Sequence, residues 1–166
     1  MSSNKLPQLK VDSVLSLFSS QQFSDALDVI DLLTVDYPED ELLFNIKGAC
    51  YAGLGQFDDA IKSYERALLI NPKYAKAYFN LGGALHELGQ LDDATINYKK
   101  SLDINPSFAE AQNNLGNVYK ELGQLDKAID SYQKALDINP KYAEAHYSVA
   151  ITFQLLDEFE KMIEHL

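Results

Sequence analysis

One phrase of this sequence occurs twice, and the distance between its copies constrains the fold more than any other feature. Residues 87–94 read ELGQLDDA and residues 121–128 read ELGQLDKA, so the copies lie 34 residues apart. An ungapped alignment of residues 75–108 with residues 109–142 contains 19 identities in 34 positions. Proline recurs with the same step, at Pro38, Pro72, Pro106 and Pro140. A fixed period of this length indicates an array of structural repeats.

Each 34-residue unit is predicted to form two helices. In residues 109–142, the segment 115–122 places apolar side chains on one helical face. Gly123 can then take the left-handed conformation that closes a helix, Asp126 can cap a second helix, and Pro140 ends it. Neither helix can bury its apolar stripe alone, so we expect neighbouring pairs to stack into a solenoid.

This pattern resembles the tetratricopeptide repeat family, and the resemblance covers nearly all of the chain. That family favours Leu-Gly, a turn glycine, an alanine, an aromatic residue and a proline at fixed places, here Leu115, Gly116, Gly123, Ala128, Tyr132 and Pro140. Small residues in such places let helices cross closely, and large ones fill the space that remains. Residues 41–74 depart from the pattern with Lys47 where leucine is usual.

The resemblance implies an all-α fold, a right-handed α-solenoid of antiparallel helix pairs. We expect one domain, residues 7–166, made of repeats 7–40, 41–74, 75–108 and 109–142 and a partial repeat 143–166. Residues 1–6 are expected to form a disordered N-terminus. Each repeat, including the partial one, is expected to turn back after its first helix, although Asp157 occupies the slot of the turn glycine there.

The C-terminal unit stops part-way through its expected second helix, with no polar capping helix after it. Several apolar side chains would lack a following layer: Leu155, Leu156, Phe159, Met162, Ile163 and Leu166. Two explanations stay open. The end face is a contact in a homo-oligomer, or the chain is the N-terminal part of a longer protein.

Composition excludes several classes of function. The formal net charge is −11 and lysine and arginine do not cluster, which argues against binding nucleic acid or anionic membranes. No apolar run approaches the roughly 18 residues of a membrane span, and no stretch resembles a signal peptide. The single cysteine, Cys50, excludes an intramolecular disulfide and a cysteine-based zinc site. We expect a cytoplasmic protein without metal or cofactor.

The sequence contains no recognisable constellation of catalytic residues. It lacks phosphate-binding and nucleophile-elbow motifs. Cys50 occupies a small core position, and His146 occupies an aromatic core position, so we expect both to be buried. The prediction is that these 166 residues do not form an enzyme.

In the family that this chain resembles, the first helices line a concave groove that binds partners. The implied groove residues here are Asn45, Lys76, Phe79, Asn80, His86, Asn113, Asn114, Asn117, Lys120 and Tyr147. Asn80 and Asn114 lie one period apart, and a row of side-chain amides can bond the backbone of an extended peptide whatever its sequence. Lys76 and Lys120 can attract acidic groups. The alternative is that these asparagines are solvated and touch no ligand.

Three functions follow as expectations. The first is a scaffold that binds a protein or extended peptide in the groove. The family's clamp for C-terminal carboxylates is not expected, because Glu110 and Glu144 stand where it needs lysine. The second is a substrate-recruiting arm of a transferase, since the turn at residues 37–40 and the Asn-Leu-Gly units resemble N-terminal repeat regions of bacterial O-GlcNAc-transferase-like and sulfotransferase-like proteins. The third is a homo-oligomeric scaffold that uses the C-terminal end face.

Overall fold

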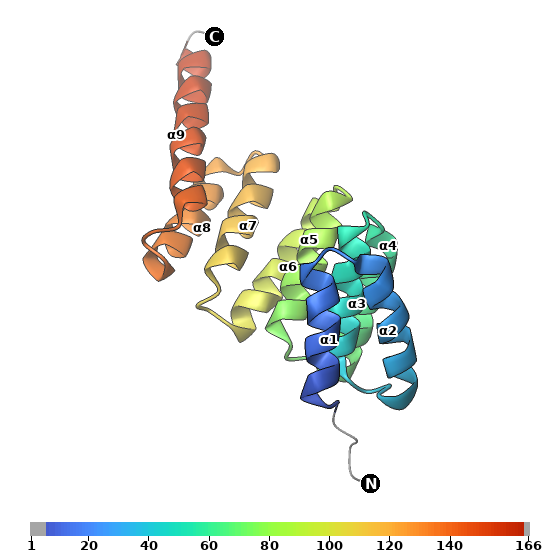
Figure 1. Ribbon diagram of the computed structural model, residues 1–166. Coiled ribbons are helices and arrows are strands. Elements are labelled where there is room, and N and C mark those ends of the chain that lie inside the picture. Colours follow the sequence, from blue (N-terminus) through green and yellow to red (C-terminus); the bar gives the residue numbers. More distant parts are fainter. Residues whose placement is uncertain (1–5, 165–166) are drawn as a thin grey trace.

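The protein is a row of antiparallel helices in the computed structural model, which describes residues 6–164, with side chains up to Asp157. Within this part of the chain every regular element is an α-helix (Figure 1): α1 (Gln8–Ser19), α2 (Phe23–Asp36), α3 (Glu41–Gly53), α4 (Phe57–Ile70), α5 (Ala75–Glu87), α6 (Leu91–Ile104), α7 (Ala109–Glu121), α8 (Leu125–Ile138) and α9 (Ala143–Glu164). The predicted all-α solenoid of helix pairs is confirmed.

The order of contacts shows which helices lie on the inner side of the stack. Each helix packs on the next one along the chain. In addition, α3 touches α5, α5 touches α7 and α7 touches α9, whereas the second helices α4, α6 and α8 make no comparable contact with one another. A stack whose first helices approach each other while its second helices spread apart is curved, with α3, α5, α7 and α9 on the concave side.

In three of the helix pairs, a tyrosine ring of the second helix packs on a glycine of the first. Gly48, Gly82 and Gly116 lie under the rings of Tyr64, Tyr98 and Tyr132, which are nearly or fully buried. A Cβ atom at Gly116 would lie 2.5 Å from Cε1 of Tyr132. The alanines Ala60, Ala94 and Ala128 are completely buried. The expected division into small and large positions is therefore confirmed, because no larger side chain fits between the crossing helices.

The turns within the repeats are built as the sequence predicts, except for the capping residue. Gly55, Gly89 and Gly123 have φ of 72°, 72° and 71°, in the left-handed region that glycine favours. The predicted cap at Asp126 is wrong. Helix α8 begins at Leu125 after Gln124 and has no side-chain cap, and Asp126 lies in its first turn. There its carboxylate stabilises the positive end of the helix dipole.

The N-terminal repeat has its own core. Leu6, which we assigned to a disordered N-terminus, is buried together with Val14, Ile30, Leu43 and Cys50. The other residues of that segment, 1–5, lie outside the described residues. The expected burial of Cys50 is confirmed, and burial raises the pKa of its thiol to about 11.

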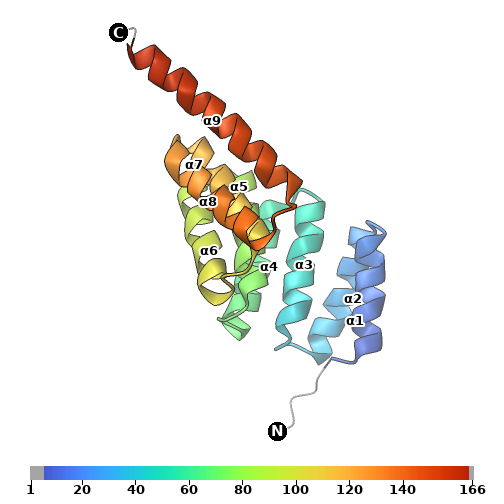
Figure 2. The ribbon, with the colours of Figure 1, turned by 90° about the vertical axis from the view of Figure 1, so that its left-hand side faces the viewer.

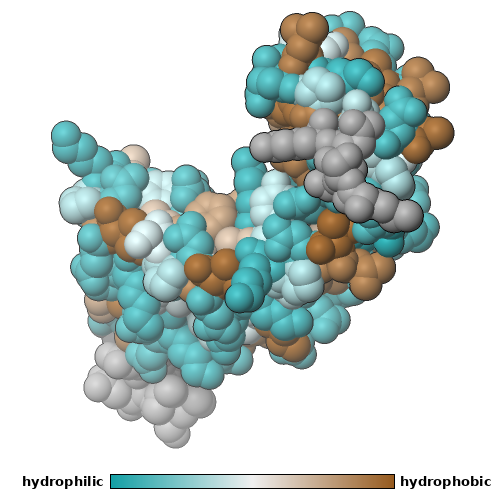
Figure 3. Space-filling model, turned by 90° about the horizontal axis from the view of Figure 1, so that it is seen from below, coloured by the Kyte–Doolittle hydropathy of each residue, from teal (hydrophilic) through white to brown (hydrophobic). Residues whose placement is uncertain are grey.

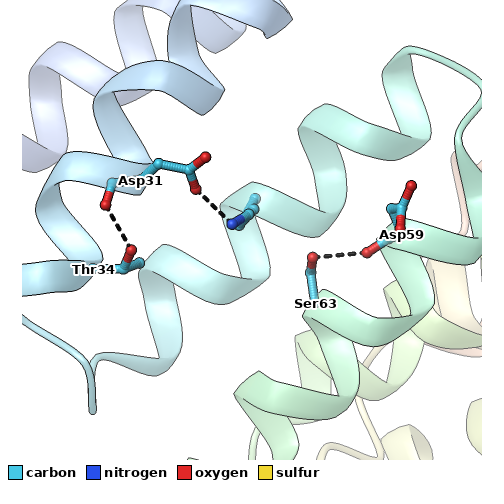
Figure 4. A network of polar contacts seen from close by, with 5 residues as sticks. Asp31, Thr34, Asp59 and Ser63 are labelled. Carbon is cyan, nitrogen blue, oxygen red and sulfur yellow. Dashed lines mark hydrogen bonds and ion pairs between the residues drawn. The ribbon is translucent and has the colours of Figure 1, made fainter.

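An ion pair between repeats explains the unusual lysine in the second repeat. Lys47 Nζ of α3 lies 2.5 Å from Oδ1 of Asp31 in α2. Figure 4 marks this contact with a dashed line from the Asp31 carboxylate. In the same view, Thr34 donates to the backbone oxygen of Asp31, and Ser63 donates to that of Asp59. Where the next two repeats have Leu81 and Leu115, this one therefore uses a polar contact between α2 and α3.

The last helix contradicts the expected fifth helix pair. Helix α9 continues from Ala143 to Glu164 without a turn at Asp157. Figures 1 and 2 show it reaching beyond the other helices. The turn residues Gly55, Gly89 and Gly123 have φ near 72°, and Gln21 takes φ of 57° at the equivalent place of the first repeat, so the lack of a glycine at Asp157 does not by itself prevent a turn. Leu155 and Leu156 are half-buried, and the side chains of Phe159, Met162, Ile163 and Leu166 lie outside the described ones.

Candidate binding groove on the first helices

The predicted groove residues differ in how far solvent reaches them. Lys76 and Tyr147 are exposed, and Tyr147 reaches 69%. Six of the others are half-buried: Phe79, Asn80, His86, Asn114, Asn117 and Lys120. The protein itself therefore covers part of most of these side chains.

Two predicted groove residues are buried instead. Asn45 and Asn113 are 4% and 0% exposed. Both lie at the same place in the repeat, and the first helix of the next repeat covers that place, because α3 contacts α5 and α7 contacts α9. Asn113 Nδ2 donates to Oε1 of Glu144 on α9, at 3.1 Å. These two amides join neighbouring helices and lie beneath the accessible wall of the groove.

The side-chain amide of Asn80 makes one hydrogen bond within the protein. Its Nδ2 donates to Oδ1 of Asn45, at 3.0 Å, across α3 and α5. Its oxygen, Oδ1, has no such partner among the described residues, so Asn80 offers a hydrogen-bond acceptor to the groove.

Asn114, one period later, lies beside a buried tyrosine. The hydroxyl of Tyr98 makes no hydrogen bond of good geometry within the described residues. Burial raises the pKa of Tyr98 to about 12, and the nearby Asn114 amide acts in the opposite direction. The two groups are therefore neighbours without an aligned hydrogen bond, and the Asn114 amide keeps its capacity to bind a ligand.

Asn117 has a stronger internal contact. The hydroxyl of Tyr132, on α8, donates to Oδ1 of Asn117, at 2.8 Å. Sequence reasoning assigned Tyr132 to the core and did not connect it with the groove. The signal available in the sequence was that an asparagine stands at this place of the repeat only here, whereas the two preceding repeats have Ala49 and Gly83.

The charged groups of the groove are mixed. Nε2 of His86 lies 2.8 Å from Oε1 of Glu121, which links α5 to α7. The His86 side chain is 23% exposed and that of Glu121 is 48% exposed. Lys76 and Lys120 add positive charge, while Glu87 and Glu110 add exposed negative charge. The groove therefore has no single sign of charge.

The aromatic groups fall into two sets. Phe79 packs against Phe108 and Tyr98, with ring centroids 4.6 Å and 5.9 Å apart, so it strengthens the junction of α5 and α6 with the following turn. Tyr147 and Phe153 on α9 are 69% and 53% exposed. In the view of Figure 3, hydrophilic side chains cover most of the surface and hydrophobic ones form separate small patches.

The prediction for His146 is wrong. Its side chain is exposed, and Nε2 lies 3.0 Å from the backbone oxygen of Pro140. Because α9 continues straight, no second helix of its own repeat returns to cover this position.

Two hollows also lie on the opposite, convex side. One, of about 410 Å³, lies between α4 and α6 and is lined by the acidic Asp58, Glu65 and Asp93. The other, of about 330 Å³, lies between α6 and α8 and has Lys99 and Lys127 at the equivalent places, with Asp103 and Asp130 beside them. Both are shallow depressions between second helices that diverge from each other.

The described part of the chain shows neither a metal-binding cluster nor a membrane span. No group of three or more His, Cys, Asp or Glu side chains there is arranged to hold a metal ion. None of the helices in that part is long and apolar enough to cross a membrane.

Comparison with known families agrees with the architecture. A family model described as "TPR repeat" matches residues 48–89, 82–123 and 116–157, three overlapping windows that advance by one 34-residue period. Together these windows cover well over half of the chain. The chain belongs to the tetratricopeptide repeat family.

Two curated proteins each match about half of this chain. The peroxisomal targeting signal receptor of Kluyveromyces lactis is 30% identical over 82 residues, which is 47% of this chain and 14% of the receptor. The small glutamine-rich tetratricopeptide repeat-containing protein 2 of Mycosarcoma maydis is 31% identical over 81 residues, 49% of this chain and 23% of that protein. The chain thus matches less than a quarter of the length of these relatives.

Solved structures share the fold. MamA from Desulfovibrio magneticus RS-1 aligns with a TM-score of 0.81 at 22% identity, over 95% of this chain and 89% of that chain. The first TPR of Spaghetti (RPAP3), bound to the HSP90 peptide SRMEEVD, aligns with a TM-score of 0.69 at 24% identity, over 70% of this chain and 93% of that chain. At these identities the likeness shows the fold alone.

Proposed function

We propose that this chain is a scaffold that binds an extended segment of a partner protein in the concave groove formed by α5, α7 and α9. The observation that carries the proposal is the row of amides on these inner helices. Asn80 offers an acceptor, Asn114 offers an amide without an aligned internal bond, and Asn117 offers two N–H donors. These groups match the alternating acceptors and donors of an extended backbone.

Two comparisons support a peptide ligand. One relative is a receptor for a targeting signal, and one solved structure of the same fold holds a peptide. The acidic HSP90 peptide itself does not suit this groove, because Glu110 and Glu144 occupy places that would meet its carboxylates. We therefore expect recognition through the backbone, with Lys120, His86 and Tyr147 adding side-chain preference.

The test begins with a pull-down that identifies a partner, followed by titration of the recovered partner. Asn80→Ala with Asn114→Ala removes two to four neutral hydrogen bonds at ~0.5–1.5 kcal/mol each, which predicts roughly a tenfold or greater loss of affinity. The matched control is Lys99→Ala with Gln133→Ala, two exposed side chains one period apart on α6 and α8. Loss of affinity in the control pair, with the groove pair unchanged, would move the site to the convex side.

A second function, self-association through α9, is favoured by the exposure of Tyr147 and Phe153. Light scattering at several protein concentrations tests it. Self-association that Tyr147→Ser and Phe153→Ser abolish would support it, and a monomer at all concentrations would exclude it. The recruiting arm of a transferase stays a prediction of the sequence, which the full open reading frame would decide.

A further inference from the structure

The ring of Tyr132 reaches from the second helix of its repeat to the wall of the groove. Tyr132 is 0% exposed and lies against Gly116, where any side chain would collide with the ring. Because no Cβ atom intervenes, the ring crosses α7 closely and brings its hydroxyl to Asn117, the next residue of that helix. The hydroxyl donates to Oδ1 of Asn117, at 2.8 Å.

Helix α9 completes the surroundings of this hydroxyl. The hydroxyls of Ser148 and Thr152 lie near it and lower the pKa of Tyr132, which burial raises to about 12. Thr152 already donates to the backbone oxygen of Ser148, at 2.7 Å. The Tyr132 hydroxyl, on α8, therefore lies close to both α7 and α9, and it donates its proton to Oδ1 of Asn117.

This contact fixes which end of the Asn117 amide faces the groove. The oxygen is turned inward to Tyr132, and no hydrogen bond within the described residues uses the two N–H donors. Asn117 is half-buried, and its amino group is the part of the amide that is left to bind a ligand. An accessible amino group with its oxygen already satisfied binds acceptors and not donors.

The two preceding repeats show that the tyrosine alone does not create this arrangement. Tyr64 and Tyr98 pack on Gly48 and Gly82 in the same way. A Cβ atom at Gly83 would lie 3.7 Å from the hydroxyl oxygen of Tyr98, so the hydroxyl reaches the same place in that repeat. The residues found there are Ala49 and Gly83, which carry no amide.

We propose that Tyr132 is a positioning residue of the groove. It holds the Asn117 amide with the amino group outward, so that this group donates a hydrogen bond to a backbone carbonyl oxygen of an extended peptide. The proposal rests on the proposed function, because it assigns a polarity to one place in the same groove.

The first experiment needs no ligand. The side-chain amide signals of Asn117 are followed by ¹⁵N–¹H NMR in the intact chain and in Tyr132→Phe, which removes only the hydroxyl. The matched control is Tyr64→Phe, which removes a similarly buried tyrosine hydroxyl from a repeat that has Ala49 at the place of Asn117. We expect the chemical shifts of the Asn117 side-chain amide to change in Tyr132→Phe and to remain unchanged in Tyr64→Phe. Unchanged Asn117 signals in both variants would overturn the proposal.

The second experiment uses acetylated, amidated penta-alanine as a probe that offers backbone groups only. Titration should shift the Asn117 side-chain signals, and Tyr132→Phe should weaken this binding roughly two- to tenfold, the equivalent of one neutral hydrogen bond. Asn117→Asp keeps an acceptor for Tyr132 but removes both donors, so it should fold normally and bind the probe less.

Equal binding by Asn117→Asp and the unaltered chain would contradict the predicted polarity even if Tyr132→Phe failed to fold. A probe that shifts no signal on α5 or α7 would count against groove binding itself. In that case the NMR comparison of Tyr132→Phe with Tyr64→Phe still tests whether Tyr132 positions the Asn117 amide.

Discussion

Replacing Gly83, Gly82 or Gly116 by alanine should change the free energy of unfolding to different extents. The distance from the new Cβ atom to its nearest neighbour predicts the order. At Gly83 a new Cβ atom would lie 3.7 Å from its nearest neighbour, the Tyr98 hydroxyl oxygen, which is ordinary contact. At Gly82, the preceding residue of the same helix, it would lie 3.0 Å from Cδ1 of Tyr98. At Gly116 it would lie 2.5 Å from Cε1 of the completely buried Tyr132, so the ring must move.

The magnitudes follow from two opposing effects. Glycine to alanine inside a helix stabilises by about 1 kcal/mol because alanine loses less backbone entropy. Overpacking a close-packed core costs about 1–3 kcal/mol. Gly83→Ala should therefore stabilise the protein by about 1 kcal/mol, Gly82→Ala should be close to neutral, and Gly116→Ala should destabilise by roughly 1–2 kcal/mol.

Urea unfolding followed by far-UV circular dichroism measures the three variants against the unaltered chain. Since the gain in helix propensity is common to all three, the difference between Gly116→Ala and Gly83→Ala isolates the overpacking. If Gly116→Ala were as stable as Gly83→Ala, the tyrosine-on-glycine crossing would not limit how closely the helices approach.

Three other predictions concern the core and the C-terminal helix. Ala94→Leu or Ala128→Leu should destabilise the protein by about 1–3 kcal/mol in the same urea assay, since both alanines are completely buried. A neutral result would show that the helix crossing has room for a larger side chain. The thiol of Cys50, whose pKa burial raises to about 11, should react with a disulfide reagent at pH 8 only when the protein unfolds, whereas rapid reaction of the folded protein would show that the core of the first repeat opens. Hydrogen exchange should be faster at 157–164 than in α5 and α7, because α9 reaches beyond its neighbours, and equal protection in a monomer would contradict this.

The helix pairs were predictable because local and repeat-level signals agree. The period, Gly123 and the small residues at Gly116 and Ala128 all point to the same crossing. The course of α9 was not predictable from the repeat, because Asp157 was assumed to turn as Gly123 does. The missing glycine alone does not account for this, since Gln21 turns with φ of 57° at the same place of the first repeat.

The groove was predictable in outline and not in detail. The repeat register places Asn45 and Asn113 with Asn80 on the inner helices, but it does not show how closely the next first helix approaches. That approach buries Asn45 and Asn113. The repeat register also could not predict the contact of Tyr132 with Asn117. That contact depends on how far the Tyr132 ring, on α8, extends over Gly116 of α7.

A backbone ¹⁵N–¹H chemical-shift map with the recovered partner segment tests the central claim most directly. The account predicts that the partner shifts signals along the inner helices α5 and α7, around Asn80, Asn114 and Asn117, and leaves α4 and the outer side of α6 and α8 unchanged. Shifts confined to the hollows between α4, α6 and α8, with the inner helices unaffected, would contradict it.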